Sequence, residues 1–235
     1  MNRKTIAIGV GATVAALVVG AVVVWPHGST DAPAAAAPPS VQYNGDTPPD
    51  PNVLAGVIPP DVTWVLSNQV AVPISPTAGP TRISPEGIRS GFAHTPSGAL
   101  MAAANWAAAD AQRYTAPGPA TIAVIDQRML PWPGHDQAKA SAVNEAAHPS
   151  NNPMTLQIAG FRFLAYDGDH ATILIAQHIT SPANAPNPGY GPWLNLVWLD
   201  NDWWIVPAID GHGEIGTPIT WPLVTPDWTN WAGVS

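Results

Sequence analysis

The chain carries few side chains that could act as a general acid or base, and they are widely separated along the sequence. The candidates for this chemistry are His94, Asp126, Tyr166, His170 and His178. Acid–base catalysis needs such groups within hydrogen-bond reach of one reacting centre. No pair among these residues has a spacing that demands such a role. We therefore expect no catalytic residue and favour structural or surface roles for the histidines.

His94 stands next to the predicted start of a helix. Free backbone N–H groups at a helix N-terminus can bind an anion, so a ligand could sit beside this side chain. The alternative is that Gly91–Pro96 is a turn leading into the helix, with Phe92 packed against it. We favour the turn, and we keep His94 as a candidate surface contact.

Two short acidic stretches, Asp167–Asp169 and Asp200–Asp202, resemble fragments of calcium-binding loops. A complete loop needs a longer pattern of oxygen ligands and a later bidentate Glu, which neither stretch has. Asp, Asn and Gly are also typical of tight turns between strands, so both stretches are predicted to be hairpin turns. The chain contains no Cys, which excludes thiolate ligands and a Cys nucleophile. We expect no metal and no cofactor.

The 11 tryptophans are the other chemically distinctive residues. Exposed aromatic rings could stack on cell-wall sugars or form a protein-docking patch. Core packing accounts for most of them, but strand alternation near residue 200 should turn one ring outward. The candidate interaction surface consists of Trp203, Trp204, Trp228, Trp231 and His94.

These residues must be positioned by helices followed by strands. The helices are predicted at Pro96 to about Arg113, with Thr95 as N-cap, at Ala120 to Met129 and at Asp136 to Ala147. An extended segment precedes them at Trp64–Ile74, where Pro73 limits it to an edge or a strand end.

Strands are predicted at Leu156–Tyr166, Ala171–Thr180, Trp193–Leu199 and Trp203–Pro207. A loop separates the second and third strands at Ser181–Pro192, and the tail at Asp210–Ser235 should be irregular cover. This order predicts an α+β domain over residues 62–235, with helices packed on one face of a curved, cone-like antiparallel sheet.

Residues 6–25 form an uncharged apolar run, IAIGVGATVAALVVGAVVVW. A helix of about 20 residues spans the roughly 30 Å hydrocarbon core of a bilayer. Arg3 and Lys4 precede the run, so residues 1–5 should stay in the cytoplasm and the domain should lie outside it. A cleaved signal peptide is the alternative, although its apolar core is usually shorter, about 7–15 residues. We predict a single-pass transmembrane helix.

Residues 26–61 are rich in proline and have little apolar periodicity. Such a segment favours extended conformations and buries too little apolar surface to fold alone. We therefore predict a disordered linker that holds the domain away from the membrane, with a docking ligand for another protein as the alternative.

The charge balance argues against nucleic acid as a partner. Without Arg3 and Lys4, 6 basic residues remain against 16 acidic ones, a formal net charge of −10. A surface with this balance has no attraction for a phosphate backbone. We expect no direct binding of DNA or RNA.

Four stretches together resemble a known group of proteins: Trp64–Pro80, Gly91–Asn105, Phe161–Tyr166 and Val197–Pro207. Over about residues 64–231 the chain is similar to small membrane-anchored envelope proteins encoded by actinobacterial integrative and conjugative elements. It departs from them at Asn201, where Gly is usual, and at Trp204, where Arg often follows Trp. The order of elements is also similar to the nuclear transport factor 2-like cone of type IV secretion assembly factors.

The resemblance implies a non-catalytic scaffold or assembly subunit of an envelope-spanning conjugative apparatus. Its expected partners are the membrane, through residues 6–25, and other envelope proteins of the apparatus, with a homo-oligomer as a further option. The alternative is a tethered domain that binds a small ligand or a cell-wall glycan outside the cytoplasm. An isomerase-like enzyme ranks third.

Overall fold

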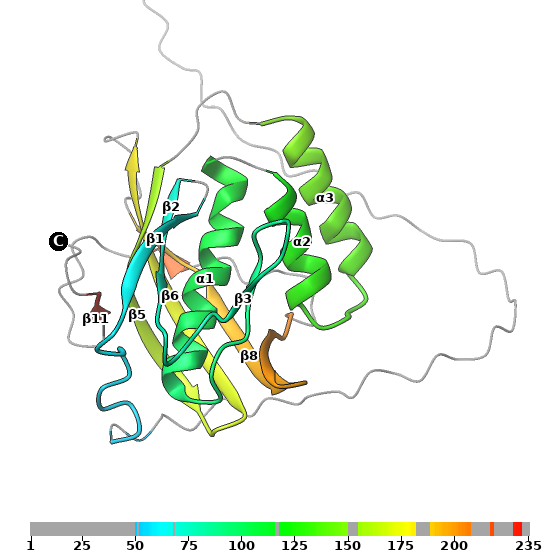
Figure 1. The fold of residues 1–235 in the computed structure, drawn as a ribbon. Helices are drawn as coiled ribbons and strands as arrows, with labels where there is room; N and C mark the ends of the chain where they lie inside the picture. The colour runs from blue at the N-terminus through cyan, green and yellow to red at the C-terminus, as the bar shows by residue number, and fades with distance from the viewer. Residues whose placement is uncertain are drawn as a thin grey trace, which may run out of the picture. The chain divides into compact units, whose positions relative to one another are not determined.

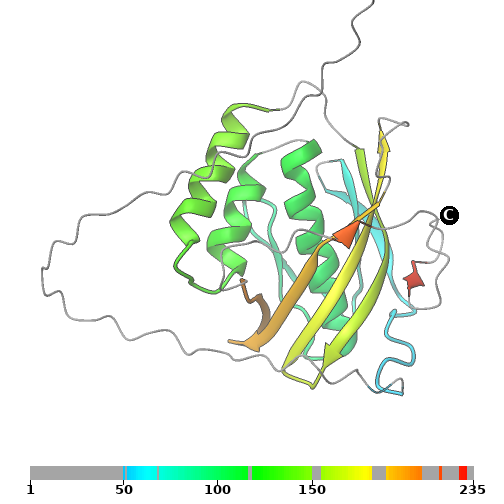
Figure 2. The ribbon, with the colours of Figure 1, turned by 180° about the vertical axis from the view of Figure 1, so that it is seen from behind.

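The structure is a computed structural model, and it describes residues 50, 52–67, 69–115, 118–149, 155–181, 189–207, 217–218 and 228–231. In this part of the chain the domain consists of three helices and a curved antiparallel sheet, together with two small hairpins. Opposite views show the helices on one face of the sheet (Figure 1 and Figure 2). The predicted α+β class is confirmed.

All three predicted helices are present, with ends close to the predicted residues. They are α1 (Pro96–Thr115), α2 (Pro119–Arg128) and α3 (His135–Ala147). Thr95 caps α1 as expected, because the Gly98 N–H donates to Thr95 Oγ1 at 3.0 Å and Pro96 begins the helix where no N–H is needed. The start of α1 is therefore the one predicted from the local sequence.

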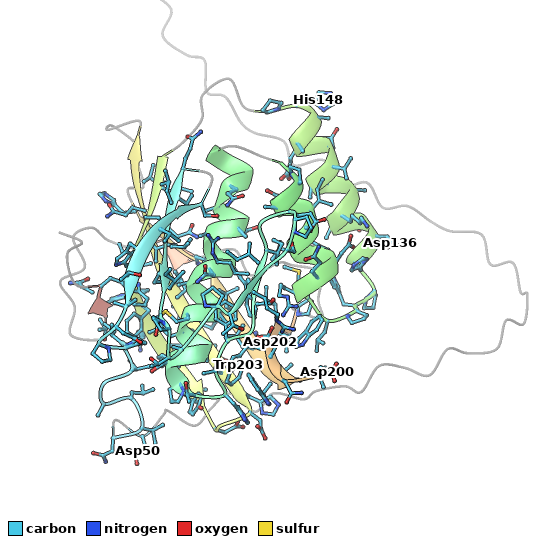
Figure 3. The ribbon with its side chains drawn as sticks, viewed as in Figure 1. Asp50, Asp136, His148, Asp200, Asp202 and Trp203 are labelled. Carbon is cyan, nitrogen blue, oxygen red and sulfur yellow. The ribbon has the colours of Figure 1, made fainter. Side chains whose placement is uncertain are left out.

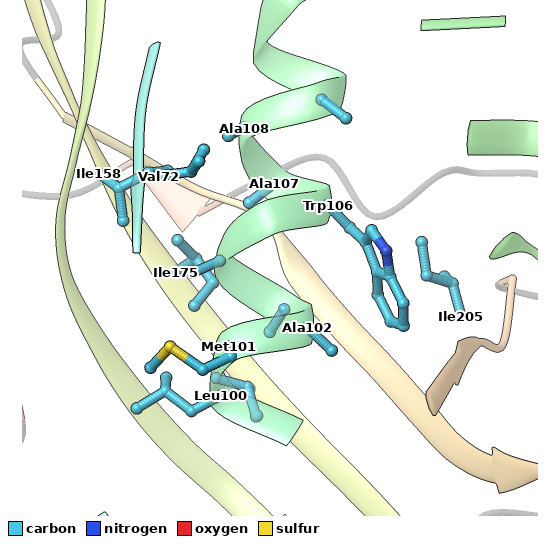
Figure 4. Packing of buried hydrophobic residues seen from close by; sticks show 14 of the residues in the cluster. Val72, Leu100, Met101, Ala102, Trp106, Ala107, Ala108, Ile158, Ile175 and Ile205 are labelled. Carbon is cyan, nitrogen blue, oxygen red and sulfur yellow. The ribbon is translucent and has the colours of Figure 1, made fainter. Parts of the chain in front are cut away.

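The middle of α1 is buried on every side, as is typical of a helix that is apolar all round. Its small side chains are at most 1% exposed at Ala99, Ala102, Ala103, Ala104, Ala107 and Ala108. They let neighbouring elements approach closely, while Leu100 and Met101 fill the space toward Ile175 in the sheet (Figure 4). Trp106 points to the other side, toward Ile205 (Figure 4). The helix is the centre of the hydrophobic core.

The sheet is built on four longer strands and three short ones. The longer strands are β5 (Thr155–Tyr166), β6 (His170–Ser181), β8 (Trp193–Leu199) and β9 (Asp202–Ile205); the short ones are β7 (Gly189–Gly191), β10 (Thr217–Pro218) and β11 (Thr229–Asn230). Hydrogen-bonded neighbours run β10-β7-β6-β5-β11, and β8 pairs with both β6 and β9. Register shifts in the β5–β6 pair mark places where a sheet bends.

The longer strands confirm the prediction, whereas the short strands correct it. β7 lies inside the predicted loop at Ser181–Pro192, and β10 and β11 lie in the tail predicted to be irregular. Two or three residues are too few to show strand alternation in a sequence. Their pairing depends on neighbours that are distant along the chain, such as Phe161 opposite Thr229.

The predicted extended segment at Trp64–Ile74 is in fact a hairpin of β1 (Thr63–Ser67) and β2 (Val70–Ile74). Pro73 lies within β2 opposite Trp64, three pairs from the turn-closing pair Ser67–Val70. Pairs alternate in an antiparallel ladder, so this one is not hydrogen-bonded and β1 needs no N–H from Pro73. The Pro73 carbonyl instead accepts from Asn105 Nδ2 at 2.8 Å. A second small hairpin follows, of β3 (Arg82–Ile83) and β4 (Arg89–Ser90).

The domain begins before residue 62, which corrects the C-terminal end of the predicted linker. Val57 and Pro59 are buried, and the Asp61 carboxylate accepts from Ser75 Oγ at 2.6 Å and from the Thr77 N–H at 3.1 Å. The bond from Ser75 is the main cause that lowers the pKa of Asp61. Proline-rich composition indicates the absence of helix and strand here, but it does not reveal these few fixing contacts.

Residues 1–49 lie outside the described residues, and with them the predicted helix at residues 6–25 and most of the predicted linker. Among the helices that are described, none is both long and apolar enough to cross a membrane. The anchor and the linker therefore stay predictions from the sequence.

Enlarging one side chain on α1 tests how tightly the core is packed. We expect Ala103→Leu to lower the free energy of unfolding by about 1–3 kcal/mol, because three added carbons find no space. Ala140→Leu on the exposed side of α3 is the matched control and should leave stability nearly unchanged. Urea unfolding of the purified domain measures both, and equal stability for the two variants would contradict the packing.

Shortening the chain tests where the domain begins. A variant starting at Asp50 should be as stable as the longer chain, whereas one starting at Val62 loses the buried Val57 side chain, worth about 2 kcal/mol, and the Asp61 bonds. Thermal unfolding of the two variants gives the comparison. A fully stable Val62 variant would restore the boundary predicted from composition.

Candidate functional site at the tryptophan hairpin

The candidate site is built around the turn between β8 and β9, which positions its side chains. Asp200 and Asn201 have φ angles of 52° and 59°, the left-handed conformation of a tight type I′ hairpin turn. Asn and Asp tolerate this conformation better than most residues. The predicted turn is confirmed, and it places Asp202 and Trp203 together at the start of β9 (Figure 3).

The Asp202 carboxylate is buried and is surrounded by donors. Oδ2 accepts from the Gly91 N–H at 2.8 Å and from Arg128 Nη1 at 2.7 Å, and Oδ1 accepts from the Phe92 N–H at 3.1 Å and the Trp203 N–H at 3.0 Å. A carboxylate has about four acceptor sites. Asp202 therefore has no free acceptor site for a substrate proton, and its role is to join the segment before α1 to β9 and α2.

Arg128 completes this arrangement from the end of α2. Its side chain is 13% exposed, and its guanidinium lies 4.8 Å from the centre of the Trp204 ring, within cation–π range. Burial is the main cause that lowers the pKa of Arg128, and the charge of Asp202 acts in the opposite direction. The exposed Arg82 adds a weaker contact to Asp202 at 3.5 Å.

A stack of aromatic rings covers the other side of the hairpin. The Trp203 indole donates through Nε1 to the Ala93 carbonyl at 2.9 Å, and the His94 ring stacks on Trp198 at 4.2 Å with an angle of 2°. His94 Nε2 lies 2.9 Å from Asp169 Oδ1 in the β5–β6 turn. His94 therefore links the segment before α1 to two hairpins.

The structure divides the predicted interaction surface into buried and accessible residues. Trp203 and Trp231 are 0% and 1% exposed, so the prediction is wrong for both, because core packing takes their rings. Trp204 and Trp228 are half-buried. The His94 side chain is 44% exposed and is the most accessible of the five.

The acid–base candidates are not gathered at one centre. Asp126 bonds to Lys139 Nζ at 2.6 Å between α2 and α3. His170 and His178 lie at opposite ends of β6, roughly 26 Å apart at the usual rise of a strand. Tyr166 packs near Trp203, at 6.4 Å between ring centres, and burial raises the pKa of its hydroxyl. His94 and Tyr166 both lie beside the Trp203 ring, whereas Asp126 is bonded between the helices.

In the acidic turn at Asp167–Asp169, backbone N–H groups of the turn itself donate to the Asp167 carboxylate. Asp167 Oδ1 accepts from the N–H groups of Asp169 and His170 at 3.1 and 2.8 Å. Across the described residues, no group of three or more His, Asp or Glu side chains is placed to hold a metal ion. The predicted hairpin turn is confirmed.

A groove between α2, α3 and the β3–β4 loop is the second feature that could take a ligand. Its volume is about 580 Å³, and it is lined by Glu86, Gly118, Pro119, Ile122, Ala123, Asp126, Gln127, Lys139 and Ala146. The Glu86 carboxylate accepts from Gln127 Nε2 at 3.0 Å. Nothing in the sequence indicated this groove, because its lining residues come from three separate segments.

Neutralising Asp202 tests its role at the hairpin. Asp202→Asn leaves the Arg128 charge without its partner, so we expect a loss of about 3 kcal/mol in unfolding free energy. Asp200→Asn makes the same chemical change two residues away, on an exposed side chain, and should have little effect. Denaturant unfolding compares the two variants, and similar stabilities would show that Asp202 does not hold these segments together.

Comparison with known proteins adds a family but no activity. No curated protein and no solved structure matches the chain. A family model described as a domain of unknown function, DUF8175, matches residues 26–220. The match covers more than four fifths of the chain, including the proline-rich segment and most of the domain. The chain therefore belongs to the DUF8175 family.

Proposed function

We propose that the chain is a non-catalytic, membrane-anchored scaffold or assembly subunit of an envelope-spanning conjugative apparatus of the type IV secretion kind. Residues 6–25 would anchor it, residues 26 to about 51 would form the linker, and the domain would lie outside the cytoplasm. The partners in this proposal are other membrane and envelope proteins of the apparatus.

The observation that carries the non-catalytic part is the packed interior between α1 and the sheet. Enzymes and carriers with a cone-like sheet use this space as a ligand cavity. Here Leu100, Met101, Ile158, Ile173 and Ile175 are all 0% exposed. The polar Gln177 in the same region donates to the Ala107 carbonyl at 2.9 Å. A domain filled in this way acts through its surface.

The cone-like, nuclear transport factor 2-like fold is part of the same proposal. It is supported by the order of helices before an antiparallel meander, by the helices on one face and by the register shifts that bend β5 against β6. The proposed membership of a conjugative apparatus rests on a resemblance. The segments Gly91–Asn105 and Val197–Pro207 resemble envelope proteins of conjugative elements. These two segments are the ones that Asp202 joins.

Cell fractionation and a transfer assay test the proposal together. The full chain should stay in the membrane fraction after a salt wash, and protease added to spheroplasts should cut its domain. Deleting the gene should reduce conjugative transfer while growth and the envelope stay intact. Recovery of a soluble chain that lacks its first residues would contradict the anchor. Wild-type transfer after deletion would contradict the role in transfer.

Two complementing variants sharpen the test of the anchor. Exchanging residues 6–25 for an unrelated transmembrane helix should restore transfer, because only the attachment matters. Exchanging residues 1–25 for a cleaved signal peptide releases the domain and should not restore it. Restoration by the released domain would show that tethering is dispensable.

The groove beside α2 and α3 favours the second candidate, a tethered small-ligand-binding domain. Its volume of about 580 Å³ lies within the usual range for ligand pockets. None of its lining residues is aromatic, which argues against stacking on a glycan. Titration of the domain with cell-wall fragments, followed by NMR, would favour this candidate only if shifts concentrate around Ile122 and Lys139.

A further inference from the structure

β1 presents a free strand edge on the outside of the domain. In the described residues it pairs with β2 alone, and α1 and β5 pack against β2. The five residues Thr63–Ser67 read TWVLS and carry no charge and no proline. Proteins usually protect such an edge with charges, proline or a bulge, because its unpaired backbone groups can bind another strand.

The register of the hairpin shows which backbone groups point outward. Ser67–Val70 closes a two-residue turn and is a hydrogen-bonded pair, as are Val65–Val72 and Thr63–Ile74. Trp64 and Leu66 occupy the alternate positions, so their N–H and C=O groups point away from β2. The Leu66 side chain is 74% exposed, the largest exposure among the large apolar side chains described.

We propose that two copies of the chain associate through antiparallel pairing of their β1 strands about a twofold axis at Val65. In this register Trp64 of each copy lies opposite Leu66 of the other, and both residues supply outward-facing backbone groups. Such an interface is self-complementary, as a twofold dimer requires. Leu66 would then cover the Trp64 ring of the second copy on the shared face of the joined sheet.

The positive charge of Arg89 lies next to this edge and would attract a second copy of the chain, which is acidic. Arg89 Nη1 donates to Ser67 Oγ at 2.9 Å, while its Nε is buried without a hydrogen-bond partner. No ion pair joins Arg89 to a described carboxylate. In the antiparallel register Ser67 faces Thr63 of the second copy, which brings Arg89 toward the segment that holds Asp61. Each end of the interface thus places a basic side chain near one carboxylate, that of Asp61.

The inference rests on the proposed scaffold function for its biological meaning, because it names one partner of that scaffold. The physical association can be tested without it. The chain contains no Cys, so a single introduced thiol reports only its own neighbour. Facing residues in a non-hydrogen-bonded pair have Cα atoms about 4.5 Å apart, within the range that a disulfide spans.

The test uses the full chain in membranes with Val65→Cys and mild oxidation. We expect a covalent dimer to form, and we expect Leu199→Cys, which is 43% exposed at the end of β8, to stay monomeric under the same conditions. Adding Leu66→Lys to the Val65→Cys chain should abolish the cross-link, because two like charges and two lost apolar contacts oppose pairing. Ile83→Lys, at a 63% exposed position, is the matched control and should leave it intact.

The proposal is overturned if folded Val65→Cys protein stays reduced, if Leu199→Cys cross-links as well as Val65→Cys, or if Leu66→Lys leaves the cross-link unchanged. Circular dichroism of each variant shows whether it is folded. The transfer assay separates the two proposals. An absent cross-link together with a transfer defect on deletion removes the dimer alone, whereas a specific cross-link with wild-type transfer removes the scaffold function alone.

Discussion

A buried carboxylate holds together parts of this domain that are distant in sequence. Asp202 accepts from the backbone of Gly91 and Phe92, more than a hundred residues earlier in the chain, and from Arg128 at the end of α2. A buried charge is stable only when its donors are in place. The position of α1, the packing of Trp203 and the contact of Trp204 with Arg128 all follow from this arrangement.

Much of the fold could be predicted from local patterns. The capped start of α1 and the alternation along β5 and β6 predict their elements because the residues involved are neighbours in the chain. The short strands β7, β10 and β11 could not be predicted, because they depend on pairing across the fold. The hairpin within residues 64–74 is local, but the two residues between its strands include no Gly, the usual sequence signal of such a turn. Asp202 is similar, since its sequence context indicates a turn and gives no hint of the four hydrogen-bond donors around its carboxylate.

The candidate site shows the same division between local and distant information. Strand alternation near the β8–β9 turn predicts that some tryptophans face inward, but it does not say which. Trp203 is buried in the core, and its indole N–H donates to the Ala93 carbonyl, a partner that no spacing reveals. The sequence places His94 beside the start of a helix, whereas its stacking on Trp198 depends on the whole sheet. The packed interior supports the proposal that the domain works through association.

The attachment at Asp61 has a mechanical consequence if the domain is tethered as we propose. Tension arriving from the N-terminal side reaches β1 at its first ladder pair, Thr63–Ile74. Pulling one strand from the open end of an antiparallel hairpin breaks its rungs one after another, which takes less force than shearing them together. The Asp61 carboxylate, bonded to Ser75 and Thr77, lies just ahead of that first rung. These hydrogen bonds must break before the two strands of the hairpin can be pulled apart from that end.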